Sequence, residues 1–231
     1  MKTKDVLVNK FSEELINLIP LSSYSQDIKF FETSNILFNN TIKFSYYDTF
    51  VIDSKKITEV FFKYNRMDLF IFLVEGQKSK GKGGTIGKQK VIFLSTNSKK
   101  GILSHEFGHS VLELGDEYSG DIPFLPSEKE VSKYKNLAIE KTNTEWEYIK
   151  KISGNKKISY YQGGMGRNKG IFHSYPVCLM KETDHPFCPI CIYYSIIILN
   201  NITGQKVDFI QVIHQDMNMQ KSPVPIIIHL Q

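Results

Sequence analysis

The 231-residue sequence has no apolar run long enough to form a transmembrane helix, which needs about 20 consecutive apolar residues. Its first ten residues carry charges and contain no apolar h-region, so the sequence as written shows no signal peptide. We therefore expect no membrane span. Localisation stays open between a cytoplasmic protein and a secreted one whose leader lies outside this chain.

The sequence also has little net charge, because Lys plus Arg exceed Asp plus Glu by only 29 − 24 = 5. A nucleic-acid-binding module would need a concentrated basic face. The basic residues gather only between Lys78 and Lys100, where no acidic residue intervenes. That stretch is typical of a solvated loop, with a cationic rim on a cleft as the alternative. We predict no nucleic-acid partner.

Cysteines are few, and all three lie within fourteen residues, at Cys178, Cys188 and Cys191. One disulfide with one free thiol fits this number, and so do three reduced thiols. Cys188 and Cys191 form a CxxC pair. Together with Cys178 and His185 they could instead hold a second, structural zinc ion.

What the sequence does contain is typical of a globular protein: 41% hydrophobic and 13% aromatic residues. The length suits one domain with two lobes, and no internal repeat is present. We expect a single domain over residues 1–200, with an N-terminal lobe (1–115) and a C-terminal lobe (116–200). Residues 201–231 are expected to form a β extension.

Hydrophobic periodicity predicts an α/β (α+β) fold with a mixed sheet. Capping-box spacings occur at Ser127 with Glu130 and at Thr144 with Glu147. After Asp68 the run to Val74 is continuously apolar, which favours a central strand buried on both faces. The expected helices are 9–19, 55–66 and 186–199; the expected strands are 41–52, 68–74, 91–94, 207–213 and 224–230. Residues 77–87 are expected to form a loop or an irregular edge, and residues 160–170 a loop.

The strongest motif is His105-Glu106-Phe107-Gly108-His109. Two histidines four residues apart on a helix share one face, where both imidazoles can reach one metal ion. Glu106 is then placed to accept a proton from a metal-bound water. Phe107 falls near Leu103 on the opposite, core-facing side of this helix. The histidine face would therefore line a cleft; a surface helix with two solvated histidines is the alternative.

A catalytic zinc keeps three protein ligands and one open position. Gly115 suits a helix C′ residue in the left-handed conformation, after which the chain turns. This turn would deliver Asp116 as the third ligand, with Glu117 as the alternative.

Two segments resemble the bacterial immunoglobulin-A-cleaving zinc metallopeptidase family. The first is HEFGHSVLELGDEY (residues 105–118), and the second is the glycine-rich YYQGGMGRNKGIFHSYPVCLM stretch (160–180) followed by FCPIC (187–191). The resemblance extends over roughly residues 15–200. The sequence departs from the metzincin pattern in two places: Gly115 stands where a third ligand is usual, and Leu112 where a glycine is usual.

This resemblance implies a metzincin-like zincin fold with an active-site helix and a C-terminal lobe. His105, His109 and Asp116 would hold one catalytic Zn²⁺, Glu106 would be the general base, and Met180 would lie in the Met-turn. It also suggests a secreted or cell-surface protein. The expected activity is that of an endopeptidase acting on protein or peptide substrates.

Other functions fit parts of the sequence. The chain could be a catalytically inactive zincin-fold binding domain whose metal serves only stability. The glycines of residues 81–84 could admit an extended peptide at a sheet edge, or could form a flexible hairpin. The sequence does not specify the cleaved bond or the oligomeric state.

Overall fold

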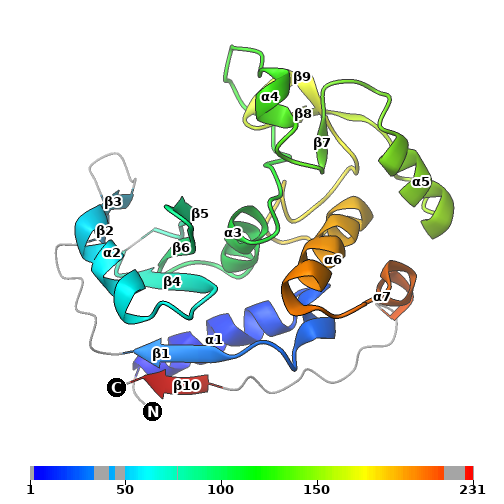
Figure 1. Ribbon diagram of the computed structural model, residues 1–231. Helices are drawn as coiled ribbons and strands as arrows, with labels where there is room; N and C mark the ends of the chain where they lie inside the picture. Colours follow the sequence, from blue (N-terminus) through cyan, green and yellow to red (C-terminus); the bar gives the residue numbers. More distant parts are fainter. Residues whose placement is uncertain (1–2, 34–41, 45–49, 77, 216–226, 231) are drawn as a thin grey trace. The chain divides into compact units, whose positions relative to one another are not determined.

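A computed structural model describes residues 3–33, 42–44, 50–76, 78–215 and 227–230 (Figure 1). These residues form a mixed α+β fold, as expected, which divides into two compact units. The first unit comprises residues 1–14, 29–111 and 225–231, and the second comprises residues 15–28 and 112–224. The chain therefore leaves the first unit at Val111, four residues before the lobe boundary expected from the sequence. The described residues 227–230 belong to the first unit.

A three-stranded mixed sheet forms the centre of the first unit, with strand order β4-β6-β5. Strand β4 (Leu69–Val74) is parallel to β6 (Gln89–Ser95), and β5 (Gly81–Ile86) is antiparallel to β6. Aromatic rings dominate the core beside it: Phe72 stacks on Phe70 and Phe93, with ring centroids 6.2 and 5.2 Å apart. Helix α2 (Ser54–Lys63) contributes the buried Ile57 and Phe61 to the same core.

The central strand of this sheet is β6 and not β4, so the expectation for residues 68–74 was wrong in position. All four residues from Val91 to Leu94 are buried, whereas β4 alternates between buried and more exposed positions. In the described part of the chain β4 pairs only with β6. The continuous apolar run of β4 therefore does not correspond to the strand that is covered on both faces, which is β6.

Two further strand pairs belong to the first unit. Strand β2 (Ile42–Phe44) pairs antiparallel with β3 (Phe50–Ile52), so the single strand expected over 41–52 is a pair of strands, and residues 45–49 lie outside the described residues. Strand β1 (Phe30–Thr33) pairs in parallel with β10 (Ile227–Leu230). The expected strand at 224–230 is thus confirmed from residue 227 onwards, and residues 224–226 lie outside the described part.

Helices α1, α2 and α3 were predicted in approximately the right places. Helix α1 (Thr3–Ile16) buries Phe11, Leu15 and Ile16, as its periodicity indicated, and begins earlier than expected. The boundary between the two units falls within it, after Glu14. Helix α2 begins after Asp53, whose carboxylate accepts the backbone N–H groups of Lys55 and Lys56. The third helix, α3 (Ile102–Ser110), carries the two histidines.

The second unit contains a small antiparallel sheet and several helices. Helix α6 begins at Pro189, three residues later than expected, with Pro189 in its first turn as predicted, and it buries Ile192, Ser195, Ile196 and Leu199. Cys188 caps this helix, since its sulfur accepts the Cys191 N–H. The remaining elements are η1 (Leu21–Tyr24), α4 (Glu128–Val131), β7 (Leu137–Ala138), α5 (Thr144–Ser153), β8 (Tyr161–Gly164), β9 (Arg167–His173), α6 (Pro189–Thr203) and α7 (Phe209–Gln215).

Several expectations for the second unit need correction. Residues 160–170 form most of the β8–β9 hairpin rather than a loop, and positive φ angles at Gly163, Gly164, Met165 and Gly166 shape its turn. Residues 209–215 form helix α7 rather than a strand. The capping box at Ser127 and Glu130 is confirmed, but α5 is capped by Asn143 and not by Thr144.

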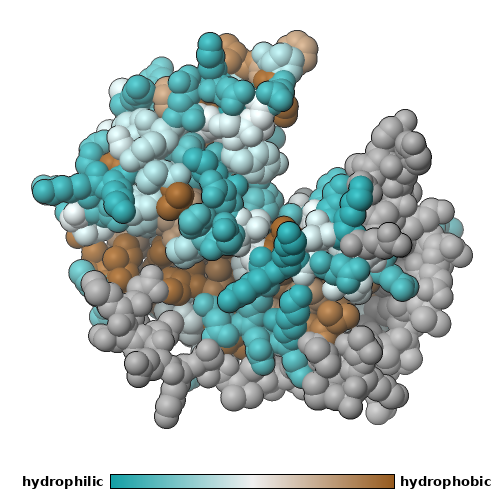
Figure 2. Space-filling model, turned by 180° about the vertical axis from the view of Figure 1, so that it is seen from behind, coloured by the Kyte–Doolittle hydropathy of each residue, from teal (hydrophilic) through white to brown (hydrophobic). Residues whose placement is uncertain are grey.

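On the face seen in Figure 2, teal and white residues predominate among the described residues, with smaller brown hydrophobic areas between them. Among the described residues no helix has both the length and the apolar composition of a membrane span.

Candidate metal centres

Helix α3 brings the two histidines of the HExxH motif together. The Nε2 atoms of His105 and His109 lie 3.1 Å apart, and their rings meet edge to face. Two nitrogen ligands at about 2.0–2.1 Å from one tetrahedral zinc ion would lie about 3.3 Å from each other. The observed pair therefore fits a shared metal ion without a large change of side-chain conformation. His105 is 8% exposed and His109 is partly buried.

Glu106 lies on the same helix and is 9% exposed. Its Oε2 atom accepts the backbone N–H of Gly83 in strand β5, at 2.5 Å. A hydrogen bond from a backbone N–H holds this carboxylate in one orientation. The sheet thus orients the group that the sequence identifies as the general base.

The glycines of β5 allow this contact between helix and strand. A Cβ atom at Gly83 would lie 2.2 Å from the Glu106 carbonyl oxygen, and one at Gly81 would lie 2.5 Å from the Glu106 Cγ. Residues 81–86 form an edge strand with regular pairing to β6, where their composition predicted a loop or an irregular edge. The glycines are needed because the helix backbone approaches the strand closely.

The segment from Ser110 to Asp116 does not have the conformation expected from the sequence. Helix α3 ends at Ser110, and the left-handed residue that follows it is Glu113 (φ 55°), so Gly115 is not its C′ residue. Gly115 is required for packing instead, because a Cβ atom there would lie 2.5 Å from Leu137 Cδ1. Asp116 follows in the second unit, and its part in the ligand set stays a prediction.

Glu117 has its own environment within the second unit. Its side chain is fully buried, and its Oε1 atom accepts hydrogen bonds from Asn136 Nδ2 at 3.0 Å and from Cys191 Sγ at 3.3 Å. Burial raises its pKa well above the usual range, and negative charge at Cys188 adds to this effect. The Glu117 side chain is therefore directed towards the cysteines. This direction does not favour Glu117 over Asp116 as the third ligand of a metal ion at the histidines.

Met180 lies in a tight turn that is joined to the same segment. The N–H groups of Lys181 and Glu182 both donate to the Cys178 carbonyl, and the Met180 carbonyl accepts the Glu117 N–H at 2.8 Å. The Met180 side chain is completely buried. The turn predicted at this methionine is present, whereas a location beneath a metal ion stays a prediction.

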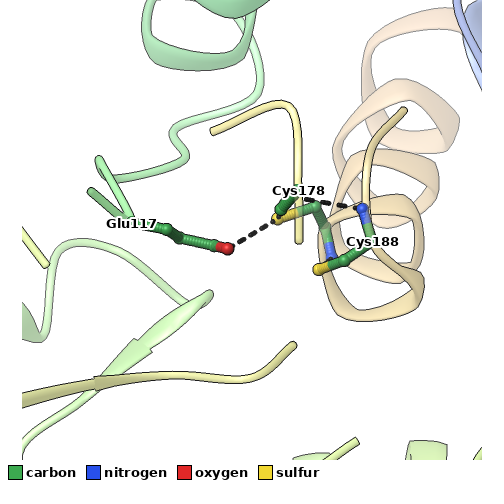
Figure 3. A group of neighbouring side chains, drawn as sticks. Glu117, Cys178 and Cys188 are labelled. Carbon is green, nitrogen blue, oxygen red and sulfur yellow. Dashed lines mark hydrogen bonds between the residues drawn. The ribbon is translucent and has the colours of Figure 1, made fainter. Parts of the chain in front are cut away.

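The three cysteines meet in the interior of the second unit as free thiols. Figure 3 shows two of them, Cys178 and Cys188, beside Glu117. The Sγ atoms of Cys178 and Cys191 are 3.6 Å apart, and Cys178 Sγ accepts the Cys188 N–H at 3.3 Å. Burial raises the pKa values of the Cys178 and Cys191 thiols. For Cys188 burial acts in the same direction, but hydrogen bonds donated to its sulfur outweigh it and lower the pKa.

Glu117 is the carboxylate partner of these thiols. One ligand atom from each of Glu117, Cys178, Cys188 and Cys191 lies within 4.8 Å of all the others. His185 does not belong to this group; it is about one-third exposed and lies beside Glu182 and Asp184. In the alternative zinc set considered from the sequence, His185 was the fourth member; in the structure Glu117 lies beside the cysteines instead.

Sequence reasoning did not connect Glu117 with the cysteines, because it considered Glu117 only as the alternative to Asp116 as a zinc ligand. Neighbouring residues in an extended segment point to opposite sides, so two successive acidic residues seldom serve one site. A buried Glu that precedes a cysteine cluster by more than 60 residues gives no local pattern.

Comparison with known proteins assigns no family to this chain. No protein-family model matches the chain, and no curated protein matches it.

Proposed function

We propose that the chain is a zinc-dependent endopeptidase with a metzincin-like catalytic domain. The observation that carries this proposal is the histidine pair, whose Nε2 atoms lie 3.1 Å apart, with a carboxylate from the same helix held by the neighbouring strand. His105 and His109 would be two zinc ligands, and Asp116, seven residues after His109, would be the third. A zinc ion bound there would lower the pKa of a water molecule towards 7 and polarise the scissile carbonyl.

In this proposal Glu106 moves the protons. Its carboxylate accepts a proton from the attacking water and then donates it to the leaving amine. The Gly83 N–H keeps the carboxylate in place through both steps. An incorrectly oriented base would lose much of its effect, because proton transfer needs hydrogen-bond distances.

The substrate would be a peptide in an extended conformation. Strand β5 pairs with β6 along one side, and the described residues include no strand on its other side. A peptide could add to such an edge through backbone hydrogen bonds. Its scissile bond would then lie close to the helix that β5 contacts.

Metal content and hydrolysis of an unstructured protein substrate test the proposal together. We expect about one zinc ion to bind tightly at the histidine site of the wild type and to be lost in His109→Ala and in Asp116→Ala. Glu106→Gln should keep this zinc ion and lose hydrolysis by at least 100-fold. Glu59→Gln, which changes an exposed carboxylate on α2 of the same unit, is the matched control and should cleave normally.

Two results would contradict the proposal. One is hydrolysis by Glu106→Gln at the wild-type rate. The other is a zinc content that His109→Ala leaves unchanged. Zinc binding that depends on the histidines, without hydrolysis of any peptide library, would favour the inactive binding domain.

A further inference from the structure

We propose that Cys178, Cys188, Cys191 and Glu117 form a second metal site, a structural site for Zn²⁺ in the interior of the second unit. This inference is independent of the proposed peptidase activity, because none of the four residues takes part in it. It extends the four-residue zinc site considered from the sequence, with Glu117 in place of His185.

The geometry of the donor atoms fits tetrahedral zinc. Zinc–sulfur bonds of about 2.3 Å place two sulfur ligands about 3.8 Å apart, and a sulfur and a carboxylate oxygen about 3.5 Å apart. The observed separations are 3.6 Å between Cys178 and Cys191 and 3.3 Å between Cys191 and Glu117. Figure 3 shows the Glu117 carboxylate pointing towards Cys178, which lies beside Cys188. An ion among these four residues needs only small adjustments of the side chains.

Glu117 also has an unsatisfied oxygen atom. Its side chain is fully buried, and Oε2 has no hydrogen-bond partner. The nearest basic group is His173 Nδ1 at 3.8 Å, but this nitrogen is 2.8 Å from the Tyr175 carbonyl, which accepts its proton. A buried carboxylate oxygen without a partner costs free energy. A cation bound beside the thiols would remove that cost.

The backbone is arranged to support thiolates. Cys188 is the N-cap of α6, and the N–H groups of Cys188 and Cys191 both point at cysteine sulfur atoms, at 3.3 and 3.5 Å. N–H donors and a helix N-terminus stabilise a thiolate, which is the form that binds metal. Because these donors are already in place, ion binding needs no rearrangement of the main chain.

The ion would join three separate parts of the second unit: the segment at Glu117, the turn at Cys178 and the start of α6. Zinc with three sulfur ligands and one oxygen ligand has no open position, so the site would be structural rather than catalytic. Soft thiolate ligands select zinc over magnesium and calcium.

The test uses the full chain carrying His105→Ala and His109→Ala, so that metal bound at the histidines does not contribute. With all three thiols shown to be reduced by titration after unfolding, we expect this protein to bind about one equivalent of Co²⁺. Cobalt–thiolate charge-transfer absorption in the near-ultraviolet should accompany binding. The zinc form should show a sulfur shell at about 2.3 Å in X-ray absorption.

Variants then identify the ligands. Cys188→Ser should lose the cobalt–thiolate absorption, and Glu117→Gln should weaken Co²⁺ binding by at least 10-fold while keeping part of the absorption. The paired control is Glu182→Gln with His185→Ala, which removes the exposed group next to the cysteines and should leave both signals unchanged. If Cys188→Ser does not fold, Glu117→Gln and the X-ray absorption spectrum still decide the question.

Three results would overturn the proposal. The first is the absence of thiolate absorption and of a sulfur shell in the folded, fully reduced protein. The second is a disulfide between any two of the three cysteines, found by peptide mapping of protein purified without reductant. The third is loss of metal in the Glu182→Gln/His185→Ala control, which would place the ion on the exposed group.

Discussion

At the scale of single residues, Asn136 connects the segment of the proposed third ligand to the rest of its unit. Its side chain is completely buried, and it both donates to and accepts from the backbone of Gly115, at 2.8 Å in each case. Its Nδ2 atom also donates to Glu117. This amide is therefore a second donor to the Glu117 oxygen that Cys191 also contacts, and it satisfies two backbone groups of Gly115 that would otherwise be buried without partners.

We expect Asn136→Ala to lower the free energy of unfolding by about 3 kcal/mol, because removing the amide leaves these groups unsatisfied. In a chain of this size the melting temperature should fall by roughly 6–12 °C. Differential scanning calorimetry measures the change. Asn201→Ala, which alters an exposed asparagine of α6, should stay within about 0.5 kcal/mol of the wild type. Equal effects of the two substitutions would contradict the assigned role.

Tyr24 provides a prediction about pH. Its hydroxyl donates to Asn200 Oδ1 at 2.8 Å, and burial raises its pKa to about 12. The unfolded chain loses this proton near pH 10. The unfolded state therefore binds fewer protons than the native state between these values, and stability should fall as pH rises from 10 through 12.

Tyr24→Phe should not show this loss of stability between pH 10 and 12. The melting temperature of the variant should start below that of the wild type at pH 8, because a hydrogen bond worth about 1 kcal/mol is lost. The difference between the two proteins should then shrink as pH rises above 10. A difference that stays constant up to pH 12 would show that the native Tyr24 ionises normally.

Sequence reasoning at this scale succeeded where the signal was local. His105, Glu106 and His109 lie on a helix because their spacing and the flanking apolar residues specify one. The partnership of Glu117 with Cys191 joins residues 74 positions apart, and no periodicity encodes such a contact. The fourth member of the cysteine cluster could therefore be found only from the structure.

At the scale of elements, the contact between α3 and β5 determines how the proposed catalytic helix is held. Gly83 faces the backbone of Glu106, whereas a Cβ atom at the neighbouring Gly84 would meet no atom within 4 Å. These adjacent glycines of one strand therefore form a matched pair for mutation.

We expect Gly83→Ala to lower the free energy of unfolding by about 1–3 kcal/mol, since the helix must move away from the strand. Hydrolysis should fall as well, because the Gly83 N–H would no longer hold the Glu106 carboxylate. Gly84→Ala should be close to neutral in both measurements. Chemical denaturation followed by circular dichroism, together with a peptide-hydrolysis assay, makes the comparison. A larger effect at Gly84 would be inconsistent with this contact.

The elements that sequence alone predicted incorrectly are those that tertiary pairing stabilises. Strand β5 has three glycines in its first four residues, a composition with low strand propensity, but β6 supplies its hydrogen bonds. Helix α7 has the β-branched, apolar sequence of a strand, and in the structure it packs against α6 instead. Helices α2 and α6 were predicted well because their periodic apolar faces match the surfaces that they bury.

At the scale of the whole molecule, the two proposed zinc sites make stability depend on metal. An ion that binds only the native state at one hundred times its dissociation constant stabilises that state by about 2.7 kcal/mol. We expect a strong chelator to lower the melting temperature of the wild type by roughly 5–11 °C for each site emptied. In the His105→Ala/His109→Ala protein, the chelator should still lower the melting temperature by the amount that the cysteine cluster contributes. A melting temperature that chelation leaves unchanged would contradict both sites.

The pairing of β1 with β10 has a consequence for synthesis on the ribosome. Phe30 pairs with Ile227, which is translated 227 − 30 = 197 residues later. At about 5–20 residues per second, the β1 segment is exposed for roughly 10–40 s before its partner is made. During that interval its backbone donors and acceptors are open to other nascent chains. A chaperone that holds extended segments would therefore be expected to improve the yield of folded protein, by acting mainly on chains that have not yet reached residue 227.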